Sequence, residues 1–236
     1  MAMTTRLNLL WEPGQSPAIT SAACASLADM LPRGACLALG PDHPPPTMDT
    51  DAIPAHHIRH PRRLAQYRMG RVLARLALEA MTGRRLIPTR DEGGRPNWPA
   101  HTVGSITHTN DLAAAVVAPA RQLAGIGIDA EEQRQLSPAA QNAVCTPAEQ
   151  ARPAQSPVLA FSAKEAIYKT LDPLGIEPLR FQDVTVIESS GQLHFSATDQ
   201  CGWADTLKRL HGVSLETDDH VLTVVWLEQD AGQSLV

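Results

Sequence analysis

The chain has 236 residues, which is enough for one large domain or two small ones, and its content of 43% hydrophobic and 19% charged residues is typical of a globular protein. The formal net charge of −5 argues against broad nucleic-acid binding, and no apolar run approaches the length that spans a membrane. Residues 1–14 lack the apolar core of a signal peptide, so we expect a cytoplasmic protein.

The first forty residues predict a strand, a helix and a second strand. Apolar runs at 7–11 and 35–39 flank an alanine-rich segment at 21–30. Five prolines between residues 41 and 54 then predict a surface loop. The histidines that follow have no carboxylate or cysteine in register, so we expect surface side chains and not a metal site. They are His56, His57 and His60.

A long helix is predicted from Pro61 to Thr82, because apolar residues recur at helical spacing and Gly83 stands where a helix commonly ends. Arg63, Tyr67 and Arg71 are spaced four apart, so the two guanidinium groups project from neighbouring turns. Such a basic face is most often only solvated. The sharper alternative is a clamp for a phosphate, whose oxygens match the guanidinium fork.

A turn at 91–99 precedes two strands at 103–107 and 113–118 that form a hairpin, with His108 at the end of the first strand. Another short strand, 123–128, leads into Asp129 and Glu131. In an extended segment these two carboxylates point the same way. They either face solvent or hold a hard cation.

Three helix starts are expected in the second half, at Ser137-Pro138, at Thr146-Pro147 with a capping box to Glu149, and at Ser156-Pro157. Strands are predicted at 184–188, 192–195 and 221–227, with a loose tail from Glu228. Both halves combine helices with antiparallel strands. We therefore predict an α+β fold with an internal duplication.

The helix that begins at Pro157 carries one broad apolar stripe, with Glu165 and Lys169 one turn apart at its edge. Lys164 falls inside the stripe, where an ammonium group is costly unless something anionic meets it. The bland interpretation is a core helix with an exposed Glu–Lys pair. The cysteines lack C-x-x-C spacing, so we expect reduced thiols, most of them packing residues, and no structural zinc. They are Cys24, Cys36, Cys145 and Cys201.

Two segments in combination resemble the signature pair of the phosphopantetheinyl transferases: Gly127-Ile128-Asp129-Ala130-Glu131, and Phe161-Ser162-x-Lys164-Glu165-Ala166-x-x-Lys169. The resemblance is greatest to the longer, pseudo-dimeric class that serves siderophore, peptide and polyketide synthases. Further marks are Arg-Arg-x-x-x-Tyr-x-x-Gly-Arg from Arg62 to Arg71, Gly94-Arg95-Pro96-x-Trp98-Pro99, and Ser105 to Thr109. The resemblance covers roughly residues 60–170.

The resemblance implies two similar α+β subdomains related by a pseudo-two-fold axis, over 1–118 and 119–236, with the active site at their interface. It also implies an activity. A carrier-protein serine would attack the β-phosphate of coenzyme A, take up 4′-phosphopantetheine and release 3′,5′-ADP.

Site roles follow from the same resemblance. Three carboxylates at ~4 Å from one another would repel by about 4 kcal/mol per pair, and an oxygen-only set suits Mg²⁺. The implied metal ligands are Asp129, Glu131 and Glu165. Glu165, directly or through a metal-bound water, would also be the base, and Lys169 and His108 complete the implied catalytic set. The implied coenzyme A contacts are Arg63 and Arg71 at the 3′-phosphate, and Arg95, Thr107, His108, Lys164 and Lys169 near the other phosphates.

Two other classes remain open. The same carboxylates could serve a Mg²⁺-dependent phosphohydrolase that uses water in place of serine, although an arginine clamp far from the metal suits a large nucleotide better. A non-catalytic coenzyme A-binding module would bind without turnover. For the transferase, the expected partners are apo acyl, peptidyl or aryl carrier proteins, with no nucleic acid, no membrane, and a monomeric enzyme.

Overall fold

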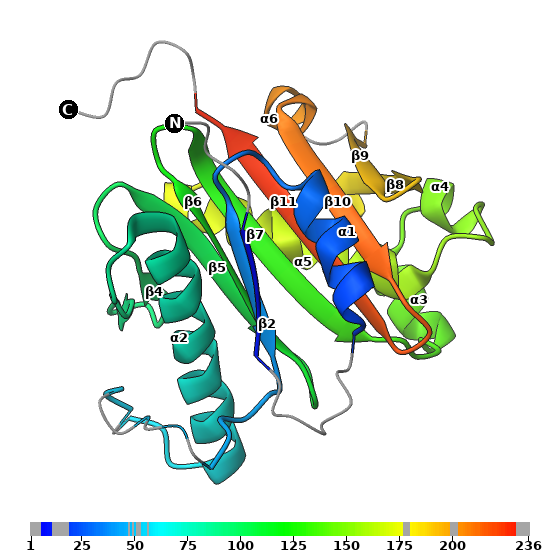
Figure 1. Cartoon of the computed structure of the whole chain (residues 1–236). Coiled ribbons are helices and arrows are strands. Elements are labelled where there is room, and N and C mark those ends of the chain that lie inside the picture. The colour runs from blue at the N-terminus through cyan, green and yellow to red at the C-terminus, as the bar shows by residue number, and fades with distance from the viewer. Residues whose placement is uncertain are drawn as a thin grey trace. The chain divides into compact units, whose positions relative to one another are not determined.

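The computed structural model divides into two compact units, Met1–Ala120 and Arg121–Val236, each described by itself below (Figure 1). The boundary expected from the sequence lay between residues 118 and 119. His56, Cys201 and the predicted tail beyond residue 229 lie outside the residues that the structure describes. The described residues are 6–10, 19–46, 48, 50, 53–55, 57–176, 180–198 and 203–229.

The first unit is built on a four-stranded sheet in the order β1 (Arg6–Leu9), β2 (Cys36–Gly40), β6 (Ala113–Pro119), β5 (Thr102–His108). The β2–β6 and β5–β6 pairs are antiparallel, as expected. The β1–β2 pair is parallel, so this sheet is mixed, with antiparallel strands at its centre and one parallel edge strand. Parallel neighbours need a crossover connection, and helix α1 (Ser21–Met30) supplies it.

One long helix, α2 (Pro61–Thr82), packs on β6 and β2 of this sheet. Its predicted bounds are confirmed, including the left-handed Gly83 (φ 71°) that ends it. The core between helix and sheet is formed by small and medium apolar side chains, among them Met69, Leu73, Ala77, Ala115 and Val117. Within the predicted turn at 91–99 the chain forms part of a two-stranded hairpin, β3 (Thr89–Arg90) with β4 (Pro96–Asn97).

The second unit is built on a five-stranded sheet whose neighbouring strands are all antiparallel. Its order is β7 (Leu123–Glu132), β11 (His220–Glu228), β10 (Leu210–Glu216), β9 (Gln192–Ala197), β8 (Val184–Ser189). Strand β7 continues four residues beyond its predicted end, so Asp129 and Glu131 belong to it. Strand β10 was not predicted, because Gly212 interrupts its apolar alternation.

All three predicted helix starts in this unit are confirmed by their caps. Ser137 caps α3 (Pro138–Val144), and Ser156 caps α5 (Pro157–Leu171). Thr146 and Glu149 form the expected capping box of α4 (Pro147–Gln150). Shorter helical turns follow, η1 (Asp172–Leu174), η2 (Phe181–Asp183) and α6 (Ala204–Lys208). Among the described helices of the chain, none is both long and apolar enough to cross a membrane.

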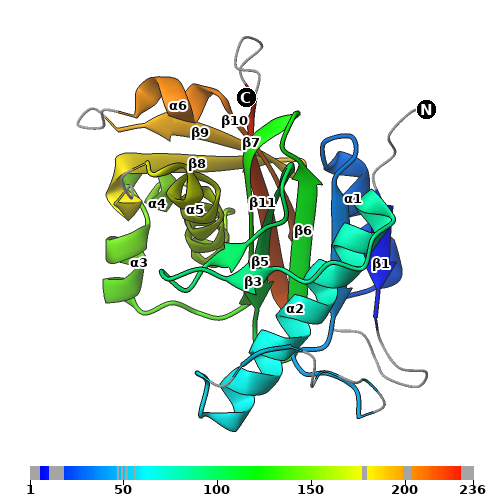
Figure 2. The ribbon, with the colours of Figure 1, turned by 90° about the vertical axis from the view of Figure 1, so that its left-hand side faces the viewer.

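Helix α5 lies against β7 and β11, with its axis close to the sheet (Figure 2). Two glycines of β7 allow this approach. A Cβ atom on Gly127 would collide with the carbonyl oxygen of Ala166, and one on Gly125 with that of Thr170. The expected apolar stripe of α5 is largely buried, but Tyr168 is 44% exposed and does not belong to the core.

Candidate active site

The close contact of α5 with β7 brings together the acidic residues of the two sequence motifs. Lys169 Nζ donates to Asp129 Oδ1 at 2.6 Å and to the carbonyl oxygen of Ile128 at 3.2 Å. Asp129 is buried, with 4% exposure, so its carboxylate does not face open solvent. Glu131 lies two residues further along β7, and Glu165 lies one helical turn before Lys169.

The negative charges of Asp129, Glu131 and Glu165 interact with one another. The pKa of Glu131 is raised from its ordinary value of 4.5 to about 7. Burial is the main cause and the charges of Asp129 and Glu165 add to it, whereas Arg134 and Lys169 oppose it. Burial also raises the pKa of Glu165, again with help from Asp129 and against Lys169. A carboxylate whose pKa is raised toward neutrality is suited to accept a proton from a substrate.

The donor set fits a hard cation in kind, because it consists of carboxylate oxygens whose negative charges repel. The arrangement of these carboxylates supports a bound cation less than their chemical type does. In the described part of the chain, no three His, Cys, Asp or Glu side chains are arranged so that they could hold a metal ion. The ammonium group of Lys169 acts as the counter-charge of Asp129 in this structure.

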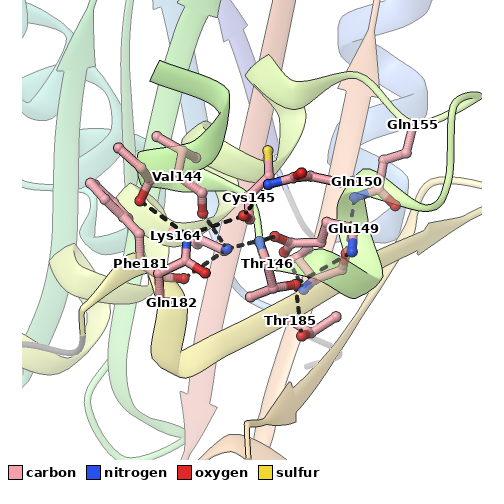
Figure 3. A network of polar contacts seen from close by, with 12 residues as sticks. Val144, Cys145, Thr146, Glu149, Gln150, Gln155, Lys164, Phe181, Gln182 and Thr185 are labelled. Atoms are coloured by element: carbon pink, nitrogen blue, oxygen red, sulfur yellow. Dashed lines mark hydrogen bonds and ion pairs between the residues drawn. The ribbon is translucent and has the colours of Figure 1, made fainter. Parts of the chain in front are cut away.

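Lys164 does not have the role expected of it. Its Nζ is buried and donates to the carbonyl oxygens of Val144 and Phe181 and to Glu149 Oε2, each at 2.8 Å (Figure 3). An ammonium group has three hydrogens, and all three are used. Burial lowers the pKa of Lys164, and the charge of Glu149 opposes this effect. The expectation that Lys164 faces substrate phosphates is therefore wrong.

A small cavity of about 170 Å³ opens beside Glu165. Side chains of α5 form one side of it, among them Glu165 and Tyr168, and Phe181 and Val184 belong to another segment of the wall. Most of this lining is apolar or aliphatic. The cavity can therefore accept an uncharged group next to the candidate base.

The first unit contains a larger cavity of about 650 Å³ whose lining is strongly basic. Arg71 is buried, with 3% exposure, and its guanidinium group stacks on the ring of Tyr67 at 4.9 Å from the centroid. Among the described residues, Nη1 of Arg71 has no hydrogen-bond partner. No acidic side chain lines this cavity in the described part of the unit. The basic lining residues are His57, Arg59, His60, Arg63, Arg71, Arg90 and His108.

Three of the residues expected to contact coenzyme A, Arg63, Arg71 and His108, thus lie around one cavity. Arg95 does not line it, because its Nε donates to Asp91 Oδ2 at 3.1 Å within the turn. Arg90 occupies the lining in its place. Thr107 is buried and alternates with Ile106 and His108 along β5, so it points to the opposite face of the sheet.

Four basic lining residues were not expected at a ligand site: His57, Arg59, His60 and Arg90. His57 and His60 are exposed, as expected, but they also line the cavity. A basic segment immediately before an arginine-rich helix was the available signal, since Arg59 and His60 precede Arg62 and Arg63. Arg90 gave no signal by itself. The hairpin of β3 and β4 that carries it was predicted only as a turn.

Family models match both units of the chain. Residues 55–118 match the 4′-phosphopantetheinyl transferase N-terminal domain, and residues 125–225 match the 4′-phosphopantetheinyl transferase superfamily. The first match includes α2, whose Arg63 and Arg71 line the basic cavity. The second includes the two motifs that carry Asp129, Glu131, Glu165 and Lys169.

Curated proteins with similar sequences agree with these matches. The 4′-phosphopantetheinyl transferase Svp of Streptomyces mobaraensis is 37% identical over 129 residues, which are 50% of this chain and 52% of that protein. The 4′-phosphopantetheinyl transferase PptT of Mycobacterium tuberculosis is 33% identical over 137 residues, 55% and 57% of the two chains. Enterobactin synthase component D of Escherichia coli K12 is 38% identical over 117 residues, 46% and 54%. The chain thus spans about half the length of the curated relatives it matches.

Proposed function

The chain belongs to the 4′-phosphopantetheinyl transferase superfamily, and on that premise we propose that it transfers 4′-phosphopantetheine from coenzyme A to a serine of an apo carrier protein. The observation that carries this proposal is that the first matched unit holds the basic cavity and the second holds Asp129, Glu131, Glu165 and Lys169, which we call the acid–lysine cluster. A large nucleotide with several phosphates needs the first. Activation of a serine hydroxyl needs the second.

The basic cavity accounts for the nucleotide part of coenzyme A. Its seven basic side chains suit a phosphorylated ligand, and a stacked guanidinium such as that of Arg71 is held ready to form paired hydrogen bonds with phosphate oxygens. We assign Arg63 and Arg71 to the 3′-phosphate, and Arg90 and His108 to the other phosphates. Arg90 replaces Arg95 in this assignment. Thr107 is not assigned to the phosphates, because its side chain points to the face of the sheet opposite this cavity.

The acid–lysine cluster accounts for the chemical step. Asp129, Glu131 and Glu165 would hold Mg²⁺, which supplies positive charge for the oxygens of the pyrophosphate. Glu165 takes the proton of the serine hydroxyl, whose oxygen forms the new bond to the β-phosphate as the bond to 3′,5′-ADP breaks. Lys169 lies one turn from Glu165 and balances negative charge at the phosphates.

Partners and oligomeric state follow from the same premise. Both family-matched units are present in one chain, so we propose that the two sites act on a single coenzyme A molecule and that a monomer is active. Size-exclusion chromatography with light scattering tests the monomer. The thiols of Cys24 and Cys145 form no disulfide, which fits a reducing compartment, and cell fractionation tests the proposed cytoplasmic location.

The decisive experiment incubates the protein with coenzyme A, Mg²⁺ and a panel of apo carrier proteins, and follows the carriers by intact-protein mass spectrometry. We expect one carrier or more to gain the mass of a single phosphopantetheinyl group, with loss of the gain when EDTA is added. Binding of coenzyme A without any mass gain would show a binding module. Hydrolysis of coenzyme A without a modified carrier would show a phosphohydrolase.

A further inference from the structure

A buried ion pair lies next to the acid–lysine cluster but is not part of it. Lys164 Nζ lies 2.8 Å from Glu149 Oε2, and the two side chains are 3% and 2% exposed (Figure 3). Both side chains are almost fully enclosed by protein, and Lys164 contributes to the wall of the cavity beside Glu165. Lys164 directly precedes Glu165 on α5.

The ammonium group of Lys164 joins segments that are far apart in sequence. Its other two hydrogen bonds go to Val144 O, at the end of α3, and to Phe181 O, at the start of η2. The ring of Phe181 also packs against that of Phe161 on α5, with 5.6 Å between centroids. The segment that begins at Phe181 is thus held on α5 by both its backbone and its side chain.

Glu149 extends the same network to the edge strand of the sheet. Its Oε1 accepts from the backbone N–H of Val186 in β8 at 2.7 Å, and its Oε2 accepts from Thr146 N at 2.6 Å. Gln155 continues along that edge, donating to Val186 O at 2.9 Å and accepting from Glu188 N at 3.2 Å. Side chains therefore take the place of a further strand beside β8.

These contacts fix one wall of the 170 Å³ cavity. Phe181 and Val184 line it from the held segment, and Glu165 and Tyr168 line it from α5. The Glu149–Lys164 pair is the polar connection between the two sides. The three hydrogen bonds of Lys164 and the two further ones of Glu149 define a relative position, which apolar packing defines less sharply.

Stability alone is a weak reason for such a pair. Removing two charges from water is costly, and apolar replacements of similar volume often stabilise a protein as well or better. We propose that Glu149 and Lys164 are positioning residues, which set the distance between the Phe181–Val184 wall and Glu165 and so align the group that reacts there. This inference rests on the proposed transferase function for its kinetic consequence.

The test uses the double variant Glu149→Gln/Lys164→Met, which removes both charges and keeps similar volumes. We expect a folded protein in which amide hydrogen exchange over residues 181–186 is at least about tenfold faster while exchange in β10 is unchanged. With carrier and Mg²⁺ saturating, we expect kcat to fall about 10- to 100-fold, as for a misplaced reactive group, and KM for coenzyme A to stay within about twofold. A merely stabilising pair would leave kcat unchanged once the variant is folded.

A matched control removes an exposed pair, by Asp205→Asn/Lys208→Met, whose atoms lie 3.0 Å apart at the surface. We expect it to change neither exchange nor kcat. Should the double variant not fold, Glu149→Asp keeps the charge and shortens its reach by one methylene, and it should lower kcat with KM unchanged. Wild-type kcat in whichever of these variants is folded, or wild-type protection of residues 181–186 in the double variant, overturns the inference. If the wild-type protein modifies no carrier, the proposed function fails and the exchange experiment still decides the positioning role.

Discussion

The two units solve the problem of concentrated charge in opposite ways. In the first unit seven basic side chains line one cavity, and no acidic side chain lines it in the described residues. In the second unit the acidic side chains come with their own cation, because Lys169 lies 2.6 Å from Asp129. The first site needs an anionic ligand to balance its charge. In the second site Asp129 is paired with Lys169, until a ligand or ion competes with that ammonium group.

The two sites therefore affect the stability of the folded protein in different ways. Like charges in a shared cavity repel, so a bound polyanion stabilises the first unit through linkage. In the second site, burial and the neighbouring negative charges raise the pKa values of Glu131 and Glu165. Changes that remove a charge should therefore act mainly on ligand affinity in the first unit and mainly on rate or on pH dependence in the second.

The largest effect is expected for Asp129→Asn. The asparagine keeps an oxygen for Lys169 but removes the negative charge, so it should lower the transfer rate by about 10³-fold, or ~4 kcal/mol in the barrier. Because Asp129 is buried, Asn is preferable to Ala, which would leave the ammonium group of Lys169 without this partner. Steady-state kinetics measure the loss. Coenzyme A affinity by calorimetry should change little, and near-normal turnover would remove Asp129 from the site.

The next effect tests whether the second site depends on the tight helix–strand contact. Gly127→Ala forces a methyl group against Ala166 O, and overpacking of this kind costs about 1–3 kcal/mol of the free energy of unfolding. Urea unfolding measures it. Gly93→Ala is the matched control, because its added Cβ meets only ordinary contacts at 3.5 Å. Equal stability of the two variants would contradict the close approach of α5 to β7.

A smaller effect is expected at the basic cavity. Arg63→Ala should lower the affinity for coenzyme A by about 10-fold, or ~1.4 kcal/mol, because one charge-assisted contact with the 3′-phosphate is lost. The affinity for 3′-dephospho-coenzyme A should fall much less. Calorimetric titration of both ligands measures the difference. Arg62→Ala is the control, since Arg62 lies on the same helix but does not line the cavity. An equal loss for both ligands would move the 3′-phosphate elsewhere.

The sequence was sufficient where a local signal and the fold agree. Caps at Ser137, Thr146 and Ser156 and the glycine after α2 are chemical signals within one turn, and the helices begin or end there. The acid–lysine cluster was predictable from two motifs, because β7 and α5 each carry a fixed spacing. The contact between β7 and α5 was implied by the resemblance and could not be derived from either segment alone.

The sequence failed where a side chain's partner lies far away along the chain. Lys164 was assigned to phosphates because it falls inside the apolar stripe of its helix, where an ammonium group needs an anionic partner. Its actual partner, Glu149, is 15 residues away and already used in a capping box. Arg90 was missed because a two-residue strand has no periodicity to detect. Both errors concern charges whose surroundings are set by tertiary packing.

The last effect to test is a dependence of stability on pH in the second unit. Because the pKa of Glu131 is about 7 in the folded protein and near 4.5 when unfolded, the folded state binds a proton more tightly. The free energy of unfolding contributed by Glu131 should therefore be largest below pH 4.5 and fall as the pH rises to about 7. Urea unfolding at several pH values measures the slope, and Glu131→Gln should flatten it, whereas His101→Gln in the first unit should not. A wild-type slope that survives in Glu131→Gln would mean that the pH dependence comes from Glu165, whose pKa is raised by burial and by the charge of Asp129.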